Sequence, residues 1–89
     1  MAKKALHNYL KDNGITEVAF IGRIPGGTTQ KTVNRLRHNR QKCSFELGIG
    51  IEIASGGEVA AETLPLTPLA RERVKAFRQH FAPRAAAHV

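Results

Sequence analysis

The stretch that decides the fold spans residues 26–40 and reads Gly26-Gly27-Thr28-Thr29-Gln30-Lys31-Thr32-Val33-Asn34-Arg35-Leu36-Arg37-His38-Asn39-Arg40. The glycine pair predicts a turn, and a threonine after it can cap a helix by accepting a hydrogen bond from an unpaired backbone N–H group. Val33 and Leu36 lie three positions apart, so they share one face of a helix and can be buried together. The stretch therefore predicts a short helix over residues 29–38 with one apolar face.

The opposite face of this predicted helix carries four donor-rich side chains, which are Gln30, Lys31, Asn34 and Arg35. Glutamine and asparagine can pair with adenine through two hydrogen bonds, and lysine and arginine can donate to O6 and N7 of guanine. A helix with an apolar back and a polar front is what a helix-turn-helix protein places in the major groove. We therefore expect these four side chains to contact bases.

Charge is distributed unevenly along the chain. The 89 residues carry a net charge of +7 with a pI of about 10.4, which favours a polyanionic partner. No acidic residue lies between Glu17 and Glu46, so the predicted helix belongs to a basic segment. Side chains that contact phosphates position a protein on nucleic acid without reading its sequence. We expect such contacts from Thr28, Thr29, Arg37, Asn39, Arg40 and Lys42.

Two further elements are expected before this stretch. Residues 3–12 carry apolar side chains at helical spacing, and Asn13-Gly14 predicts the end of that helix. Residues 15–24 allow two interpretations, because their β-branched and aromatic composition fits a strand, whereas Thr16 could cap a helix. That helix would bury Val18, Ala19 and Ile21, with Phe20 as a further candidate.

Residues 44–64 also allow either a helix or strands. Every second residue from 45 to 53 is apolar, which by its period favours a strand, and a tight turn at residues 55–58 would complete a β-hairpin. As a helix, the segment would be capped by Ser44, but two interior glycines would cost it about 2 kcal/mol. The pattern alone favours the strand.

The last part of the chain predicts one more helix. Thr67 can cap it, Pro68 fits its first position, and apolar residues recur at helical spacing up to residue 81. Pro83 predicts its end. The expected organisation is a helix-turn-helix domain at 1–66, a helix for packing or dimerisation at 67–82, and a flexible tail at 83–89.

Two motifs stand on either side of a basic loop: TQKTVNRL at residues 29–36 and SFELGIGIEIASGGEV at residues 44–59. The first resembles the DNA-reading helix of the Cro-type helix-turn-helix regulators of phages and prophages, especially the YdaS-like subgroup. The second resembles their fourth helix and the glycine pair that follows it. The resemblance implies a small all-α fold in which residues 44–54 are helical, against their period. It does not extend before residue 29, so the second helix is left unplaced. The other Cro architecture, an α+β fold with a β-hairpin at about 45–64, remains the alternative.

The resemblance implies a sequence-specific transcriptional regulator, a Cro-like repressor that reads the major groove of double-stranded operator DNA with the helix 29–38. One such helix covers few base pairs, so we expect a homodimer on an inverted repeat. The apolar stripe of Phe45, Ile49 and Ile53 and the last helix would form the dimer interface, unless the two cover each other within one chain.

Two other functions fit the same basic face. One is a phage-encoded inhibitor that occupies a nucleic-acid channel in a host complex, and the other is an RNA-binding βαβ module if residues 17–24 and 45–53 are strands. No catalytic, cofactor or metal-binding motif is present, so we expect a protein that is not an enzyme and needs no cofactor. A single cysteine and the lack of any apolar run near the roughly 18–20 residues of a membrane span lead us to expect a cytoplasmic protein with no membrane partner. The resemblance to phage regulators implies that the cell is a bacterial host.

Overall fold

The computed structural model describes residues 4–87, with side chains described for residues 4–80. This part of the chain is mostly helical and contains no strand, which confirms the all-α expectation. Its elements are α1 Leu6–Asp12, α2 Glu17–Ile21, α3 Gln30–Arg37, α4 Phe45–Ala54, the 3-10 helix η1 Ala61–Thr63 and α5 Pro68–Ala87. The β-hairpin at about 45–64 is therefore wrong, and so is the βαβ architecture, because α2 and α4 occupy the segments that strands would have needed.

Three helices, α2, α3 and α4, begin where local side-chain chemistry predicts, and α1 and α4 also end there. Thr16, Thr29 and Ser44 each accept a hydrogen bond from the backbone N–H three residues further on, at 3.1 or 3.2 Å. After α1 and α4, Gly14 and Gly56 adopt left-handed φ angles of 63° and 66°. In both cases the next residue donates its N–H back to the last turn of the helix, which is the Schellman way of ending a helix.

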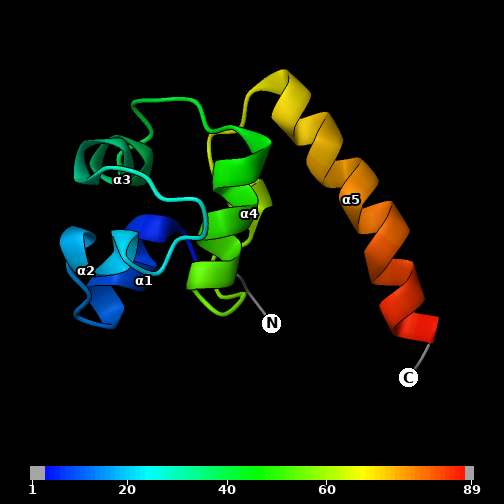
Figure 1. Cartoon of the computed structure of the whole chain (residues 1–89), viewed down its shortest axis with the longest axis horizontal. Helices are drawn as coiled ribbons and strands as arrows, with labels where there is room; N and C mark the ends of the chain where they lie inside the picture. The colour runs from blue at the N-terminus through cyan, green and yellow to red at the C-terminus, as the bar shows by residue number, and fades with distance from the viewer. Residues whose placement is uncertain (1–3, 88–89) are drawn as a thin grey trace.

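α4 is the central helix of the molecule. In Figure 1 it lies between α1, α2 and α3 on one side and α5 on the other. Ile51 is fully buried, and Phe45, Leu47 and Ile49 pack partly buried against the core. A helix that is covered on several sides carries apolar residues all round. This explains why the apolar residues of α4 alternate as they would in a strand.

Two glycines let α4 approach its neighbours closely. A Cβ atom at Gly50 would lie 3.1 Å from Cγ2 of Ile24 and 3.4 Å from the carbonyl oxygen of Pro25, and one at Gly48 would lie 3.2 Å from Cδ2 of Leu66. The helix loses some intrinsic stability at these positions but gains close packing, at Gly50 against the segment that leads into α3 and at Gly48 against the segment that leads into α5.

We expect Gly50→Ala to lower the free energy of unfolding by about 1 kcal/mol, because overpacking costs about 1–3 kcal/mol and alanine regains only about 1 kcal/mol of helix propensity. Urea unfolding followed by circular dichroism measures the change. Gly22→Ala is the control, since a Cβ atom there would lie 3.5 Å from the carbonyl oxygen of Ala19, an ordinary contact. We expect Gly22→Ala to be neutral or slightly stabilising, and a Gly50→Ala protein that is also stabilised would contradict the close packing.

The first half of α5 packs against α4. Ala70 and Val74 are buried, and the rings of Phe45 and Phe77 meet edge to face with 6.0 Å between centroids. The apolar stripes of the two helices, which were candidates for a dimer interface, therefore partly cover each other within one chain. Ile53 and Leu69 are not covered, and they are 60% and 69% exposed.

Arg78 joins α5 to α4 and to η1. Its guanidinium group donates hydrogen bonds to both carboxylate oxygens of Glu52 and of Glu62. Glu52 also accepts a hydrogen bond of 2.9 Å from the backbone N–H of Ala61. Burial raises the pKa of Glu52, but the hydrogen bonds from Arg78 and Ala61 outweigh burial and hold that pKa below its usual 4.5.

Two predicted helix ends differ from the structure. α5 continues through Pro83 to Ala87, so the predicted end at Pro83 is wrong, and the expected tail at 83–89 is helical as far as it is described. Proline disfavours a helix interior, but alanine, the strongest helix former, occupies positions 82 and 85–87 around it. At the other end, the first helix begins at Leu6 instead of residue 3, and residue 3 itself lies outside the described residues.

The buried side chain of α2 is Phe20, which the sequence offered only as a further candidate. Phe20 is fully buried, and its ring lies 5.9 Å from the ring of Tyr9, centroid to centroid. Val18 is 58% exposed and Ala19 is exposed, so the burial predicted for these two residues is wrong. Apolar residues fill four consecutive positions of this five-residue helix, and its contacts with α1 and α3 decide which of them faces the core.

Candidate nucleic-acid interface

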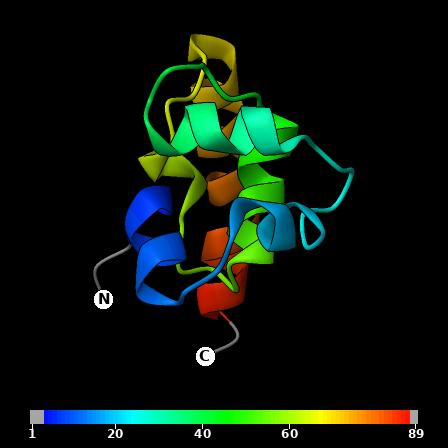
Figure 2. The same cartoon turned by 90° about the vertical axis from the view of Figure 1, so that its left-hand side faces the viewer.

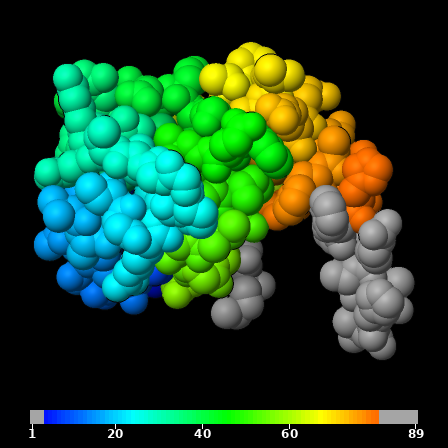
Figure 3. Space-filling view, viewed as in Figure 1, coloured from blue at the N-terminus to red at the C-terminus, as the bar shows by residue number. Residues whose placement is uncertain are grey.

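α3 lies at the end of the molecule opposite α5, with α2 beside it (Figures 1 and 2). The space-filling view shows the same arrangement, with the atoms of α2 and α3 forming the end that is remote from α5 (Figure 3). Val33 is 0% exposed and Leu36 is 1% exposed, so these two residues dock the helix on the core as predicted. The four residues predicted to face outward, which are Gln30, Lys31, Asn34 and Arg35, are all exposed.

Lys31 and Arg35 are the two exposed cations of α3. They are four positions apart, so they stand one above the other on the exposed face of the helix. Neither makes an ion pair with any acidic residue in the described part of the chain, and the same is true of Arg40 and Lys42 in the loop that follows. These four residues, here called the basic segment, leave their charges available to an anionic partner.

One carboxylate accepts hydrogen bonds from three further polar side chains of α3. Glu17, the first residue of α2, accepts hydrogen bonds from Nδ2 of Asn34 at 3.0 Å, from Nη1 of Arg37 at 3.0 Å and from Nε2 of Gln30 at 3.4 Å. Its side chain is only 11% exposed, and that of Arg37 is 17% exposed. This contact could not be predicted from the sequence, because the partners lie 13 to 20 residues apart and Glu17 fitted the first turn of a helix.

The three donors keep Glu17 charged. Burial raises the pKa of its carboxyl group, but the hydrogen bonds from Asn34, Arg37 and Gln30 outweigh burial and hold that pKa below its usual 4.5. Glu17 is therefore ionised at neutral pH, and its hydrogen bonds stabilise the packing of α2 on α3. Because the pKa of Glu17 is lower in the folded than in the unfolded protein, this carboxylate stabilises the fold fully above about pH 4.5. The stabilisation is lost as the pH falls through the pKa that Glu17 has in the folded protein.

Arg37 also ties α3 to α1. Its Nε atom donates a hydrogen bond of 3.1 Å to Nδ1 of His7, and the ring of His7 lies 5.6 Å from the ring of His38. Two sides of the guanidinium group are therefore occupied within the protein. Arg37 was predicted to contact phosphate, but the structure places it in the contact between three helices instead of on the outer face.

The loop after α3 places the remaining cations. Asn39 takes a left-handed φ of 57°, and the backbone N–H groups of Asn39 and Arg40 donate to the last turn of α3 at 3.1 and 2.8 Å. Asn39 thus ends the helix and fixes the direction of the loop. Beyond it, Arg40 and Lys42 are exposed around a hollow of about 190 Å³ that Gln41 and Pro65 complete. Hydrogen bonds between the backbone of Cys43 and that of residues 65 and 67 hold the end of the loop.

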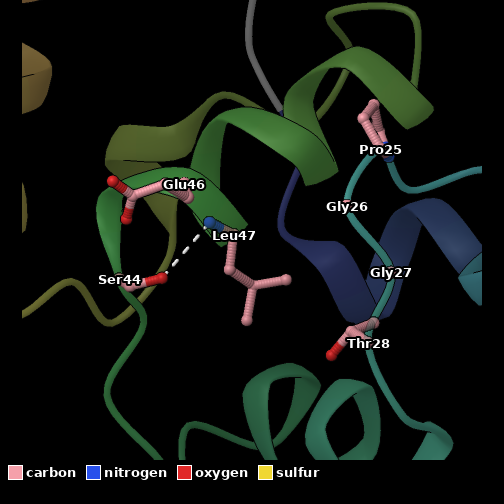
Figure 4. Close-up of a pocket in the computed structure, with 7 residues that line it drawn as sticks. All are labelled: Pro25, Gly26, Gly27, Thr28, Ser44, Glu46 and Leu47. Carbon is pink, nitrogen blue, oxygen red and sulfur yellow. Dashed lines mark hydrogen bonds between the residues drawn. The ribbon is translucent and has the colours of Figure 1, made fainter.

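The two threonines before α3 have structural roles. The hydroxyl group of Thr29 accepts the capping bond from Thr32 and donates a hydrogen bond of 3.0 Å to the hydroxyl of Thr32. Thr28 is half-buried and lines a hollow of about 200 Å³ between residues 25–28 and the first turn of α4 (Figure 4). Glu46 also lines this hollow, but its carboxylate points away from Thr28 and pairs with Nη1 of Arg73 at 3.3 Å.

The connection between α2 and α3 runs over residues 22–29. The turn of a standard helix-turn-helix motif has about three or four residues, so the pair α2–α3 is not of standard form. Gly26 and Gly27 have φ angles of 83° and 77°, which L-residues with side chains rarely adopt, and they let the longer connection turn back towards α3. The added residues allow Ile24 to reach the core, where it is buried.

Cys43 is buried in the core. Burial raises the pKa of the Cys43 thiol to about 11, so the thiol stays protonated and unreactive at neutral pH. Among the described residues, no group of three or more histidine, cysteine, aspartate or glutamate side chains is placed to hold a metal ion. No helix within residues 4–87 combines the length and apolarity that crossing a membrane requires.

Comparison with known proteins adds no family. No family model, no curated protein and no solved structure matches this chain.

Proposed function

We propose that this protein binds double-stranded DNA in a sequence-specific way and regulates transcription, with α3 in the major groove. The observation that carries the proposal is the pair Lys31 and Arg35, which are exposed and have no acidic partner among the side chains of residues 4–80. They lie on a helix whose opposite face is docked by Val33 and Leu36. A rigid helix with two outward cations at this spacing suits donation to O6 and N7 of guanine. α2 and α3 would act as a helix-turn-helix pair with a lengthened turn.

The proposed contacts fall into two groups. Lys31 and Arg35 contact bases, and Asn34 and Gln30 contribute through the amide atoms that Glu17 leaves free. Arg40 and Lys42 contact phosphates, because they lie in the loop that leaves the end of α3 and are exposed. Arg37 is left out of the phosphate contacts because Glu17 and His7 hold its guanidinium group.

A regulator of this kind would act in the cytoplasm of a bacterial cell as a dimer. One α3 covers too few base pairs for selectivity in a genome, and a two-fold pair on an inverted repeat doubles the number read. Ile53 and Leu69 are the exposed apolar residues on the helices that would meet in such a pair. Sedimentation of the protein with and without its DNA site would measure the pairing.

Selection from a library of random duplexes tests the proposed function. We expect the protein to enrich one DNA motif that contains guanines, and to bind that duplex more tightly than single-stranded RNA of the same length at matched salt. Enrichment of no motif, or tighter binding to the RNA, would contradict sequence-specific DNA binding. Tighter binding to the RNA would favour a protein that uses the basic segment on RNA.

Arg40→Ala tests the phosphate contacts separately. We expect weaker binding to every duplex and a salt dependence whose slope is reduced by about 0.9, so the ratio of wild-type to variant affinity should fall about threefold between 50 and 200 mM salt. Fluorescence anisotropy titrations measure both. Arg71→Ala removes one exposed cation from α5, at the other end of the molecule, and should leave the affinity and the slope unchanged.

A further inference from the structure

Glu17 is an unexpected residue to find beside a surface proposed to bind DNA. A carboxylate close to phosphates repels them and costs affinity. This carboxylate is nonetheless nearly buried between α2 and α3, and it is held by donors from three positions that follow one face of α3. Arg37 balances its charge at 3.0 Å, so the pair carries no net charge.

The chemistry of the asparagine amide shows what this contact does. The side-chain amide of Asn34 has two N–H donors and one carbonyl acceptor. Its Nδ2 donates to Oε2 of Glu17 at 3.0 Å. The flipped amide would set its carbonyl oxygen against an ionised carboxylate, and two acceptors repel each other. Glu17 therefore fixes the orientation of the amide and turns the carbonyl oxygen of Asn34 away from α2.

A fixed amide has a defined base preference. The outward carbonyl oxygen of Asn34 needs a donor, and in the major groove the exocyclic amino groups of adenine and cytosine are the donors. The remaining N–H of the amide can also donate to N7 of adenine, so adenine fits best. Gln30 is oriented in the same sense but through a longer contact of 3.4 Å. Guanine and thymine present acceptors where Asn34 presents its carbonyl oxygen, and they would be disfavoured.

We propose that Glu17 is a positioning residue that orients Asn34 and thereby makes the protein select a base with an exocyclic amino group, preferably adenine, at one position of its DNA site. This inference rests on the proposed function. Glu17 itself contacts no base. It acts through the direction in which it holds the amide of Asn34.

Two substitutions of Glu17 separate orientation from charge. Glu17→Gln offers a carbonyl group and an NH₂ group, so the amide of Asn34 can bind it in either orientation, and the net charge of the protein rises by one. Glu17→Asp keeps the charge but shortens the side chain by one methylene group. The carboxylate then no longer reaches the position 3.0 Å from Nδ2 of Asn34 that it occupies in the wild type. Both should relax the same base preference, whereas only Glu17→Gln should raise the affinity for non-specific DNA. Glu72→Gln changes the charge equally on α5 and is the matched control.

The experiment is selection from a random duplex library, read by sequencing, for the wild type, Asn34→Ala, both Glu17 variants and Glu72→Gln. Asn34→Ala identifies the position that Asn34 reads, as the one whose preference it removes. We expect the preference for adenine there to fall about tenfold in each Glu17 variant, while the guanine positions and the Glu72→Gln motif stay unchanged. If Glu17→Gln does not fold, as thermal unfolding would reveal, Glu17→Asp gives the result alone.

The outcomes separate this inference from the function beneath it. A wild-type motif whose Asn34-dependent position keeps its preference in the Glu17 variants that fold would overturn the role of Glu17 and leave DNA binding standing. An Asn34→Ala protein with the wild-type motif would do the same. A wild type that enriches no motif would overturn the proposed function and this inference with it.

Discussion

Phe20→Ala is expected to lower the free energy of unfolding by about 3–5 kcal/mol, the usual cost of removing a fully buried phenylalanine side chain. Phe20 is 0% exposed and packs on Tyr9, so the variant would leave a cavity where α2 meets α1. A domain of this size has a total stability of about 5–13 kcal/mol, so the loss would be a large part of it. α2 has five residues and cannot persist through its own backbone hydrogen bonds.

Urea unfolding of both proteins measures the change. Val18→Ala is the matched control on the same helix, and because Val18 is 58% exposed we expect a change below about 0.5 kcal/mol. Equal effects of the two substitutions, or a larger effect of Val18→Ala, would show that α2 packs through its other face.

The second large effect is expected from the double variant Lys31→Ala/Arg35→Ala. Each good contact with a base edge contributes about 1–3 kcal/mol of discrimination, so loss of both should weaken binding to the selected duplex by about 30-fold to 25,000-fold. Both side chains are exposed and make no ion pair among the described residues, so the fold should stay as stable as before.

Anisotropy titrations at one fixed salt concentration measure this loss. The control is Arg71→Ala/Lys75→Ala, which removes two exposed cations with the same spacing from α5. It lowers the net charge equally, so it should weaken binding only slightly. If the two double variants lose affinity equally, the protein binds DNA through its overall charge and α3 does not read bases.

Local chemistry in the sequence predicted the residues at which helices could begin, although it left residues 15–24 and 44–54 open between helix and strand. Thr16, Thr29 and Ser44 cap helices because a hydroxyl group can bind a free N–H whatever the rest of the chain does. The docking of α3 was also predictable, because Val33 and Leu36 are the apolar residues that share its inner face.

The alternation in α4 was misleading for a tertiary reason. Apolar residues and glycines at every second position fit a strand, and only the resemblance to Cro-type regulators favoured the helix. In the structure, Leu66 approaches α4 at Gly48 and Ile24 approaches it at Gly50. Contacts between segments so far apart in the chain cannot be predicted from the local pattern of apolar residues. The burial of Phe20 in place of Val18 has the same origin.

The candidate site was predictable only in part. The exposure of Lys31 and Arg35 follows from their position on the helix opposite Val33 and Leu36. The contacts of Asn34 and Arg37 with Glu17 do not follow, because they depend on how α2 is set against α3 after a connection of unusual length. The hydrogen bonds of an exposed polar side chain are decided by which neighbour the fold brings within reach.

The most direct test of DNA binding by α3 is a titration of the ¹⁵N-labelled protein with a duplex selected from the library, followed in two-dimensional ¹H–¹⁵N spectra. We predict that the largest shifts fall on residues 29–42, with Lys31 and Arg35 among them, and that the signals of α5 up to residue 80 shift less, because pairing of two copies would change only the surroundings of Leu69. Shifts concentrated on α5, or no shifts when duplex is added in excess, would contradict the proposal that α3 is the DNA-binding element.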